Sequence, residues 1–282
     1  MGTLPANCAV RSLGLDFPGP VGLAAGFDRD GRHLRDILGW GFGFVELGTV
    51  TPQAEPDHNP GAAALAANLV RSGLLDRGIG ARPVIGVSLG LQPASPPQCA
   101  WRDYLYGMHV LWRHADYLVL NFSSTTARPL HTAGQRSTLL ALLAHAQEER
   151  QRLVVATGRR VPLLVKWPVS PAFDDAAEMA QRLRGFGYDG LIAVFDPGLA
   201  EAVAWEAWVP GACRQIAEAI GAQMTLIAVG GIDCARRAVA VQCAGASLVQ
   251  IYRGFLAGGP PLVREVASAW ADQTAAARAA VV

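Results

Sequence analysis

A group of small polar residues ends one of the most apolar runs of the chain. The segment VLNFSSTT (119–126) passes from β-branched and aliphatic side chains to Asn121, two serines and two threonines. Buried polar groups cost free energy unless they are paired or bind a partner. A strand that ends in so many hydroxyls and amides therefore favours a ligand-binding or catalytic site at its carboxyl end.

Two further kinds of strand end carry groups that a cofactor site needs. Lys166 follows the apolar run LLV (163–165), where a charge is costly unless it is paired, and a fixed cation there can hold the electron-rich end of a cofactor or an anionic substrate. The glycines of AVGGI (228–232) and YRGF (252–255) let backbone N–H groups approach an anion, with a helix N-terminus behind them. Glycines that merely ease tight turns are the alternative, but the two loops together favour a phosphate site.

The elements that must position these groups follow a regular order. Helix-length amphipathic segments alternate with continuous apolar runs, which are typical of parallel strands covered on both faces. Eight strand–helix units predict a (β/α)8 TIM barrel, with a doubly wound open sheet as the alternative. The eight predicted strands are 21–26, 42–50, 83–90, 116–124, 161–169, 189–196, 224–232 and 247–255.

The chain reads as one domain over residues 1–282, because no linker interrupts the units. Residues 1–20 are expected to lead into the barrel and close its bottom, and the alanine-rich segment 270–282 is expected to fray. In such a barrel the carboxyl ends of the strands form one rim, where active sites are built. The polar groups described above are then neighbours.

Composition excludes several classes of function. Of 282 residues, 51% are hydrophobic, and 24 basic against 23 acidic residues leave a net charge of +1, so no charge field attracts nucleic acid or a membrane. The five cysteines form no C-x-x-C pair and the six histidines show no ligand spacing, so no metal site is expected. No signal or membrane-spanning segment is visible, and we expect a cytoplasmic protein.

Seven separated motifs follow one another along the chain: NCAVRSLGLDFPGPVGLAAGFDRDG (7–31), GFGFVELGTVTP (41–52), ADYLVLNFSS (115–124), PLLVKWP (162–168), DGLIA (189–193), AVGGI (228–232) and GASLVQIYRGF (245–255). In their order and spacing they resemble the dihydroorotate dehydrogenase family, particularly its quinone-dependent class. The resemblance covers roughly residues 7–60, 83–196 and 224–268.

The resemblance implies an FMN-dependent barrel and assigns roles to matched positions. It makes Ser124 the general base that removes a proton from the substrate while hydride passes to the flavin, with Asn121 and Lys166 beside the ring. A serine is a weak base and needs a water or a partner to carry the proton onward. The FMN phosphate would be held by Gly230, Gly231, Tyr252, Arg253 and Gly254, and further flavin contacts would come from Ala24, Ala25, Gly26, Thr49, Asn121 and Lys166.

Departures from the family pattern concentrate on the substrate side. Thr125 and Thr126 stand where the family has proline and asparagine, and Val194, Phe195 and Asp196 replace a threonine, an asparagine and a threonine. Unpaired polar groups of a pyrimidine cost about 1–3 kcal/mol each. The lost amides therefore predict an altered pocket and a substrate other than dihydroorotate.

Other departures lie in the loops. Ser88 and Leu91 replace an asparagine and a lysine, and HNPGAAALAANLVRSG (58–73) stands in place of an asparagine-bearing loop. Arg29 keeps the positive charge of a substrate-binding lysine. The predicted substrate contacts are Arg29, Thr126, Phe195 and Asp196, with Phe195 making the pocket more apolar and Asp196 pairing with Arg29 or selecting a cationic or amide-rich group.

Three functions stay open. The first is an FMN oxidoreductase acting on CH–CH bonds of another small anionic or heterocyclic metabolite; the second is a redox-inactive barrel with a binding or assembly role; the third is a divergent, true dihydroorotate dehydrogenase. The N-terminal helices of quinone-dependent members are not recognised before residue 7, so we expect another electron acceptor or a partner protein, and a homodimer is left open.

The sequence leaves three roles open for Trp205 and Trp208: a lid over the pocket, a partner surface, or core packing.

Overall fold

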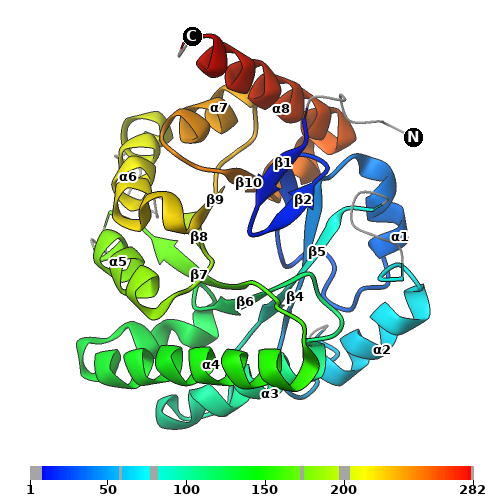
Figure 1. Cartoon of the computed structure of the whole chain (residues 1–282), viewed down its shortest axis with the longest axis vertical. Helices are drawn as coiled ribbons and strands as arrows, with labels where there is room; N and C mark the ends of the chain where they lie inside the picture. Colours follow the sequence, from blue (N-terminus) through cyan, green and yellow to red (C-terminus); the bar gives the residue numbers. More distant parts are fainter. Residues whose placement is uncertain (1–7, 57–58, 77–81, 172–174, 197–203, 281–282) are drawn as a thin grey trace.

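A closed parallel barrel of eight strands forms the centre of the protein (Figure 1). The computed structural model describes residues 8–56, 59–76, 82–171, 175–196 and 204–280. Strand β10 pairs with β3, which closes the ring, so the predicted barrel is confirmed and the open sheet is excluded. The barrel strands are β3 (Val21–Leu23), β4 (Phe44–Val50), β5 (Val84–Leu89), β6 (Tyr117–Asn121), β7 (Leu163–Val169), β8 (Gly190–Phe195), β9 (Thr225–Val229) and β10 (Leu248–Ile251).

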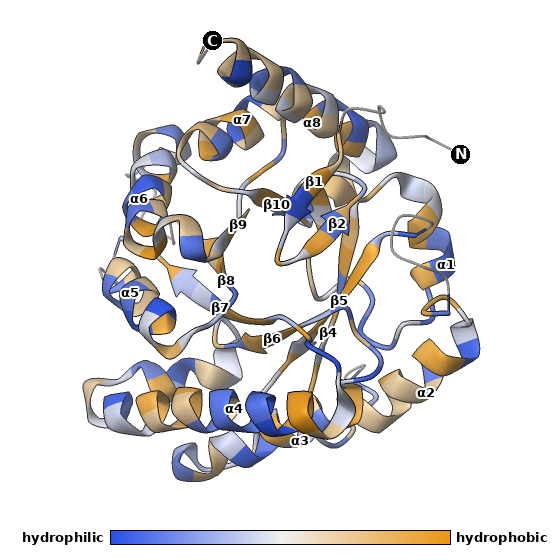
Figure 2. Cartoon of the chain, viewed as in Figure 1, coloured by the Kyte–Doolittle hydropathy of each residue, from blue (hydrophilic) through white to orange (hydrophobic). Residues whose placement is uncertain are grey.

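Helices surround the ring of strands (Figure 1). Polar and apolar bands alternate along these helices, as expected of elements with one face on a core and one in water (Figure 2). They are α1 (Leu34–Ile37), α2 (Ala62–Ser72), α3 (Ala100–Leu111), α4 (Arg136–Thr157), α5 (Ala176–Phe186), α6 (Trp205–Ile220), α7 (Ala235–Cys243) and α8 (Arg253–Ala279), which is kinked at Gly259. Short 3-10 helices are η1 (Leu38–Trp40), η2 (Pro97–Cys99), η3 (Thr125–His131), η4 (Ala133–Gln135) and η5 (Gly221–Gln223).

Two apolar clusters explain why the strands are apolar throughout. Side chains that point into the barrel, among them Phe44, Tyr117, Leu164 and Ile192, form one cluster. Side chains that point outward pack against the helices in a second, larger cluster. Because both faces of each strand are buried, neither face needs polar residues, and the strands show no alternation.

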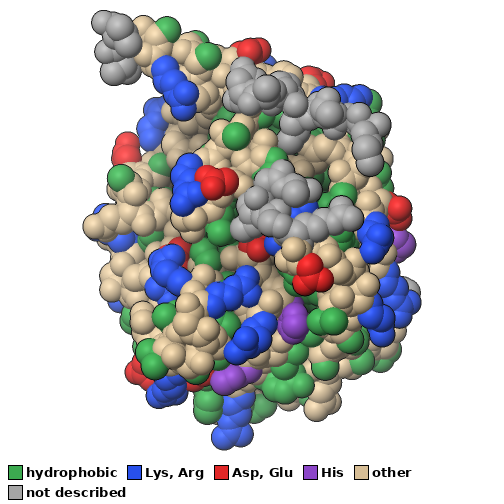
Figure 3. All heavy atoms as spheres, turned by 45° about the vertical axis from the view of Figure 1, so that its right-hand side comes forward, with side chains coloured by type: hydrophobic (Ala, Val, Ile, Leu, Met, Phe, Trp, Pro, Cys, Tyr) green, Lys and Arg blue, Asp and Glu red, His purple; other side chains and the backbone are tan. Residues whose placement is uncertain are grey.

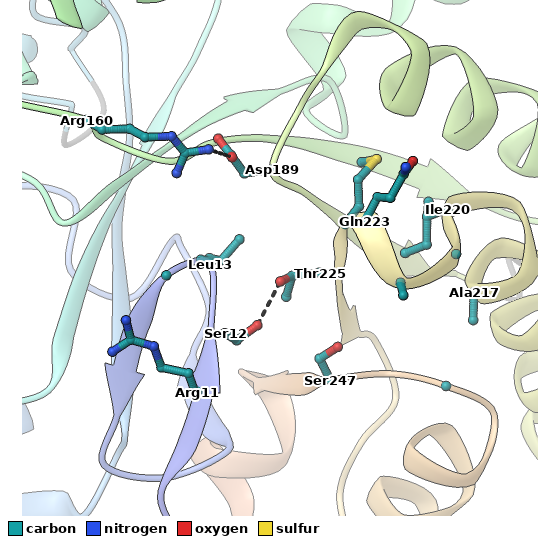
Figure 4. Close-up of a pocket in the computed structure, with 15 residues that line it drawn as sticks. Arg11, Ser12, Leu13, Arg160, Asp189, Ala217, Ile220, Gln223, Thr225 and Ser247 are labelled. Carbon is teal, nitrogen blue, oxygen red and sulfur yellow. Dashed lines mark hydrogen bonds and ion pairs between the residues drawn. The ribbon is translucent and has the colours of Figure 1, made fainter.

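An antiparallel hairpin of β1 (Val10–Ser12) and β2 (Leu15–Phe17) lies at the amino ends of the barrel strands. Phe17 packs edge-on against Phe44 inside the barrel, with ring centroids 5.4 Å apart. The Ser12 and Thr225 hydroxyls share a hydrogen bond of 2.7 Å next to a cavity of about 550 Å³ (Figure 4). The described part of the lead-in segment thus packs into the barrel opening opposite the strand carboxyl ends.

The carboxyl end of the chain differs from the prediction. The segment 270–282 was expected to fray, yet α8 continues to Ala279. Trp270 and Ala271 are buried in the outer core, so packing holds the first part of this segment in helical form. Among the described helices, none combines the length and apolar character needed to span a bilayer.

Basic and acidic side chains are mixed over the surface. Figure 3 shows both kinds scattered among neutral and apolar groups on the side of the molecule that it presents. This distribution agrees with the net charge of +1 for the whole chain.

Candidate active site

The carboxyl ends of the strands surround a cavity of about 660 Å³, and every barrel strand or the loop after it contributes to its wall. This mouth unites eight of the residues predicted to serve in catalysis or cofactor binding: Ala24, Ala25, Gly26, Thr49, Asn121, Ser124, Lys166 and Tyr252. They come from five strands or strand ends, so only the closed barrel brings them together.

A chain of hydrogen bonds fixes the amide of Asn121. The Asn121 Nδ2 group donates to Thr49 Oγ1 at 2.7 Å, and Thr49 shares a 2.9 Å hydrogen bond with the hydroxyl of Ser88. The Ser123 hydroxyl donates to Asn121 Oδ1 at 2.7 Å, and the Tyr104 hydroxyl donates to the Asn121 carbonyl oxygen at 2.9 Å. Because both ends of the amide are bonded, its orientation at the mouth is set before any ligand binds.

Ser124 stands directly before η3 and caps it. Its Oγ accepts a hydrogen bond from the backbone N–H of Ala127 at 3.3 Å, and its side chain is half-buried in the cavity wall. The other end of η3 is held by His131, whose Nε2 lies 2.8 Å from the carbonyl oxygen of Phe122 and whose ring lies 4.5 Å from that of Trp167. A hydroxyl facing the cavity from a fixed turn can take part in proton transfer.

Lys166 is paired inside the barrel, as its buried position requires. Its Nζ lies 2.8 Å from Glu46 Oε1, and the other oxygen of Glu46 accepts from Gln250 Nε2 at 2.5 Å. All three side chains are buried, and Lys166 also lines the cavity. Burial, with a smaller contribution from the charge of Glu46, raises the pKa of the neighbouring Tyr117, which therefore stays neutral. Because Glu46 holds Lys166 in place, the ammonium of Lys166 is a fixed cation at the cavity wall.

The loop after β3 forms another wall. Gly26 has a φ of +108°, and a Cβ there would lie 3.9 Å from the Tyr252 ring, so Gly26 and Tyr252 are neighbours in the cavity wall. The buried carboxylate of Asp28 accepts hydrogen bonds from the backbone N–H groups of Gly31 at 2.8 Å and His33 at 3.1 Å. Asp28 therefore shapes the turn that carries Arg29 to the cavity wall.

A second cavity of about 430 Å³ adjoins the first and shares Val229 and Tyr252 with it. Its lining includes the remaining predicted phosphate contacts: Gly230, Gly231, Arg253 and Gly254. The glycines are required by close packing, since a Cβ on Gly230 would lie 2.0 Å from the carbonyl oxygen of Phe195 and one on Gly254 would lie 2.5 Å from that of Ile232. Backbone N–H groups at a glycine turn and at a helix start suit an anion.

The predicted substrate residues are only partly united. Arg29 and Thr126 line the larger cavity, whereas Phe195 and Asp196 are not among its lining residues. Phe195 is buried against Trp208, with ring centroids 6.2 Å apart, and Val194 lines the cavity in its place. Successive side chains of a strand point to opposite faces, so Val194 points inward and Phe195 outward. The prediction that Phe195 makes the pocket more apolar is therefore wrong, and Val194 is the apolar residue of β8 that lines the cavity.

Several residues of this site carried no clear signal in the sequence. Glu55 and Asn59, in the loop after β4, line the cavity although this loop lacks the family pattern. Glu46 and Gln250 hold Lys166, and only the barrel register shows that strands β4, β7 and β10 place them together. Asn68 lies in the segment 58–73, which replaces the asparagine-bearing loop of the family. Its side chain donates to the Asp30 carbonyl oxygen, and Asn68 is not among the residues that line the cavity.

A parallel barrel whose mouth joins a glycine turn to a polar cavity has the architecture of a barrel enzyme, with its site at the carboxyl ends of the strands. The family model for dihydroorotate dehydrogenase matches residues 7–196 and 211–272. The chain belongs to the dihydroorotate dehydrogenase family, as its motifs indicated, and it is a flavin-dependent oxidoreductase acting on CH–CH bonds.

Similar proteins support this assignment. A dihydroorotate dehydrogenase (quinone) of Acidovorax sp. (strain JS42) is 36% identical over 303 residues, which cover 93% of this chain and 86% of the relative. The enzyme of the same name from Azotobacter vinelandii is 36% identical, over 94% of this chain and 85% of its own. The crystal structure of an Eimeria tenella DHODH in complex with ferulenol superposes with a TM-score of 0.80 at 27% identity, covering 96% of this chain and 85% of that one. These likenesses support the family and do not support the altered substrate that the departures predicted.

Proposed function

We propose that this protein is a dihydroorotate dehydrogenase that binds FMN and oxidises dihydroorotate to orotate. The observation that carries the proposal is the junction of the two cavities, which share Val229 and Tyr252. One cavity offers glycine N–H groups and Arg253 for a phosphate, and the other offers space for a flat ring beside Lys166 and Asn121. This donor set fits FMN, whose phosphate and ring lie at opposite ends of one molecule.

Bound FMN would supply the acceptor for a hydride leaving the substrate. The chain's own residues prepare the site for it. The ammonium of Lys166, fixed by Glu46, offers positive charge to the electron-rich side of the ring, and the amide of Asn121, fixed by Thr49 and Ser123, offers a hydrogen-bonding group that does not need to reorient. Groups fixed in advance stabilise developing charge more effectively than mobile ones.

Ser124 would act as the base. Oxidation of the CH–CH bond removes one hydride and one proton, and the proton comes from the carbon next to the ring carbonyl, where it is most acidic. Ser124 Oγ accepts that proton while its own hydroxyl proton passes to water, because a free serine alkoxide is too basic to form at neutral pH. Arg29, which lines the same cavity, would pair with the carboxylate of dihydroorotate.

An oxidoreductase for a different small substrate is a second candidate. Val194, Leu91 and Pro93 line the larger cavity with apolar groups, and Glu55 adds a carboxylate that already accepts from Gln92. A pyrimidine has several ring N–H and C=O groups, and these three apolar side chains offer them no hydrogen bond. This part of the lining would suit a substrate with fewer hydrogen-bonding groups on the ring.

A spectrum of the purified protein and a reduction experiment separate these functions. We expect flavin absorbance that bleaches when dihydroorotate is added without oxygen, and rescue of a pyrimidine auxotroph by the gene. Ser124→Ala should slow bleaching about 10²–10⁴-fold and leave the oxidised spectrum unchanged. Thr132→Ala, which alters an exposed hydroxyl that donates to the Pro129 carbonyl oxygen, is the matched control.

Different outcomes reject different candidates. A yellow protein that dithionite bleaches and dihydroorotate does not would reject the proposed substrate and favour the second candidate. A colourless protein that takes up no added FMN would reject both and favour a binding or assembly role.

The sequence led us to expect another electron acceptor or a partner protein, but the names of the bacterial relatives include quinone, and we propose a quinone as the acceptor. Reoxidation of the reduced protein by a short-chain ubiquinone, compared with fumarate and with NAD, would test this class. Faster reoxidation by fumarate or NAD would contradict it.

A further inference from the structure

Two side chains hold the glycine turn after β9 from behind. Trp205 is the first residue of α6, and Arg237 lies in the first turn of α7. Both contact the backbone of the turn, and neither lines the 430 Å³ cavity. We refer to this pair as the Trp205–Arg237 clamp.

Trp205 makes the closer contact. Its Nε1 donates to the carbonyl oxygen of Gly230 at 3.0 Å, and its side chain is almost fully buried. Gly231 has a φ of +69°, and a Cβ there would lie 2.5 Å from Trp205 Cδ1 and 2.6 Å from Nε1. The indole thus packs directly against the turn, and Gly231 has no side chain because the indole occupies that space.

Arg237 holds the next carbonyl. Its Nη1 donates to the carbonyl oxygen of Gly231 at 2.9 Å, and its guanidinium lies 5.0 Å from the centroid of the Trp205 ring. Asp233 and Glu206 accept from the same guanidinium at 2.9 and 3.0 Å. The hydrogen bond from Arg237 lowers the pKa of Glu206, so this carboxylate stays charged and keeps the guanidinium in place at neutral pH.

The two held carbonyls determine where two N–H groups point. In a trans peptide unit the C=O and the following N–H point in opposite directions. Holding the carbonyl of Gly230 therefore orients the N–H of Gly231, and holding the carbonyl of Gly231 orients the N–H of Ile232. Gly231 and Ile232 both line the 430 Å³ cavity, and within the described part of the chain neither N–H has a protein acceptor. The N–H groups of Gly231 and Ile232 therefore point away from Trp205 and Arg237 and can donate to a ligand in the cavity.

We infer that the Trp205–Arg237 clamp gives the cofactor site its selectivity for a phosphorylated flavin. The two residues are positioning residues: they touch no cofactor atom, and they act by aiming the N–H groups of Gly231 and Ile232 at the phosphate. This inference rests on the proposed function, because it takes the ligand of the glycine turn to be the phosphate of FMN. Trp205 is buried against this turn, which favours core packing among the three roles left open for it.

Binding of FMN and of riboflavin to the flavin-free full-length protein tests the inference, because riboflavin lacks only the phosphate. Trp205→Phe removes the N–H donor and keeps an aromatic ring; Arg237→Met removes the guanidinium and keeps an unbranched stem on the indole. Each should lower FMN affinity about 10–100-fold, the range for losing one or two hydrogen bonds to a charged group, and change riboflavin affinity less than about threefold.

Matched controls lie close by. Arg236→Met removes a neighbouring arginine that also bonds Glu206 at 3.0 Å but touches neither glycine carbonyl, and Trp208→Phe alters the second tryptophan of α6, which packs on Phe195. Both should bind the two flavins like the parent protein. Circular dichroism shows which variants are folded. If only one of Trp205→Phe and Arg237→Met is folded, the flavin affinities of that variant test the inference.

The outcomes are distinct. Equal loss of FMN and riboflavin affinity, or no loss of either, would overturn the role of the clamp while the proposed function stands. A parent protein that binds neither flavin would overturn the proposed function itself and, with it, the inference.

Discussion

Replacement of Glu46 by glutamine removes the counter-ion of a buried lysine with almost no change in shape. In the parent protein Glu46 accepts from Lys166 Nζ at 2.8 Å and from Gln250 Nε2 at 2.5 Å, and all three side chains are inside the barrel. The glutamine keeps the volume of the side chain and loses its negative charge. The ammonium of Lys166 is then left buried without a carboxylate.

The expected cost is large because the barrel interior excludes water. Removing one partner of a buried ion pair costs about 3–5 kcal/mol of unfolding free energy, whereas an exposed pair contributes about 0–1 kcal/mol. For a chain of this size, a loss of that magnitude lowers the melting temperature by roughly 6–20 °C. Asp16→Asn breaks the exposed Arg11–Asp16 pair and serves as the control, which should unfold like the parent protein.

Thermal and urea unfolding of the flavin-free protein measure the effect. The double variant Glu46→Leu, Lys166→Met should recover much of the stability that Glu46→Gln loses, because an apolar pair of similar volume replaces a buried ion pair at little cost. A Glu46→Gln variant within about 1 kcal/mol of the parent protein, or a double variant less stable than Glu46→Gln, would refute the reasoning.

Three further predictions follow from the same structure. Gly230→Ala should abolish FMN binding and lower stability by about 2 kcal/mol or more, because φ is +117° and a Cβ would lie 2.0 Å from the Phe195 carbonyl oxygen. Gly134→Ala, with open space around the added Cβ, should change neither property. Normal flavin binding by Gly230→Ala would contradict this prediction. Burial lowers the pKa of His131, so protonation favours the unfolded chain, and stability should fall as the pH drops through about 6.5, the pKa of an exposed histidine. In His131→Gln the urea midpoint should therefore depend less on pH between pH 8 and 5. The same pH dependence in the variant and the parent protein would contradict this. Burial raises the pKa of Cys213 to about 12, so mass spectrometry after iodoacetamide treatment at pH 8 should find the exposed Cys243 modified and Cys213 intact; early modification of Cys213 would show that it is not protected.

The barrel could be predicted because its strands are buried on both faces, but the same property hid which side chains line the mouth. At the end of β8 both Val194 and Phe195 are apolar, so no alternation marks the inward position. Only the register of the closed barrel shows that Val194 lies in the cavity and Phe195 against Trp208.

Contacts between distant segments were the other limit. The motifs identified Lys166 and the glycine turns one at a time, each from its local pattern. The partners of these groups lie far away in sequence, as with Glu46, 120 residues from Lys166. The Trp205–Arg237 clamp likewise depends on how two helices start beside one turn, which no local pattern encodes.

The seam between β3 and β10 has a consequence for the synthesis of this protein. Val21 and Val249 are paired across that seam, so the ring stays open until nearly the whole chain has left the ribosome. Until then β3 and the newest strand present unpaired edges, which are prone to intermolecular pairing. Chains released early, before residue 248, would therefore be expected to aggregate, and a protein that needs its last strand to close is expected to depend on chaperones when it is overproduced.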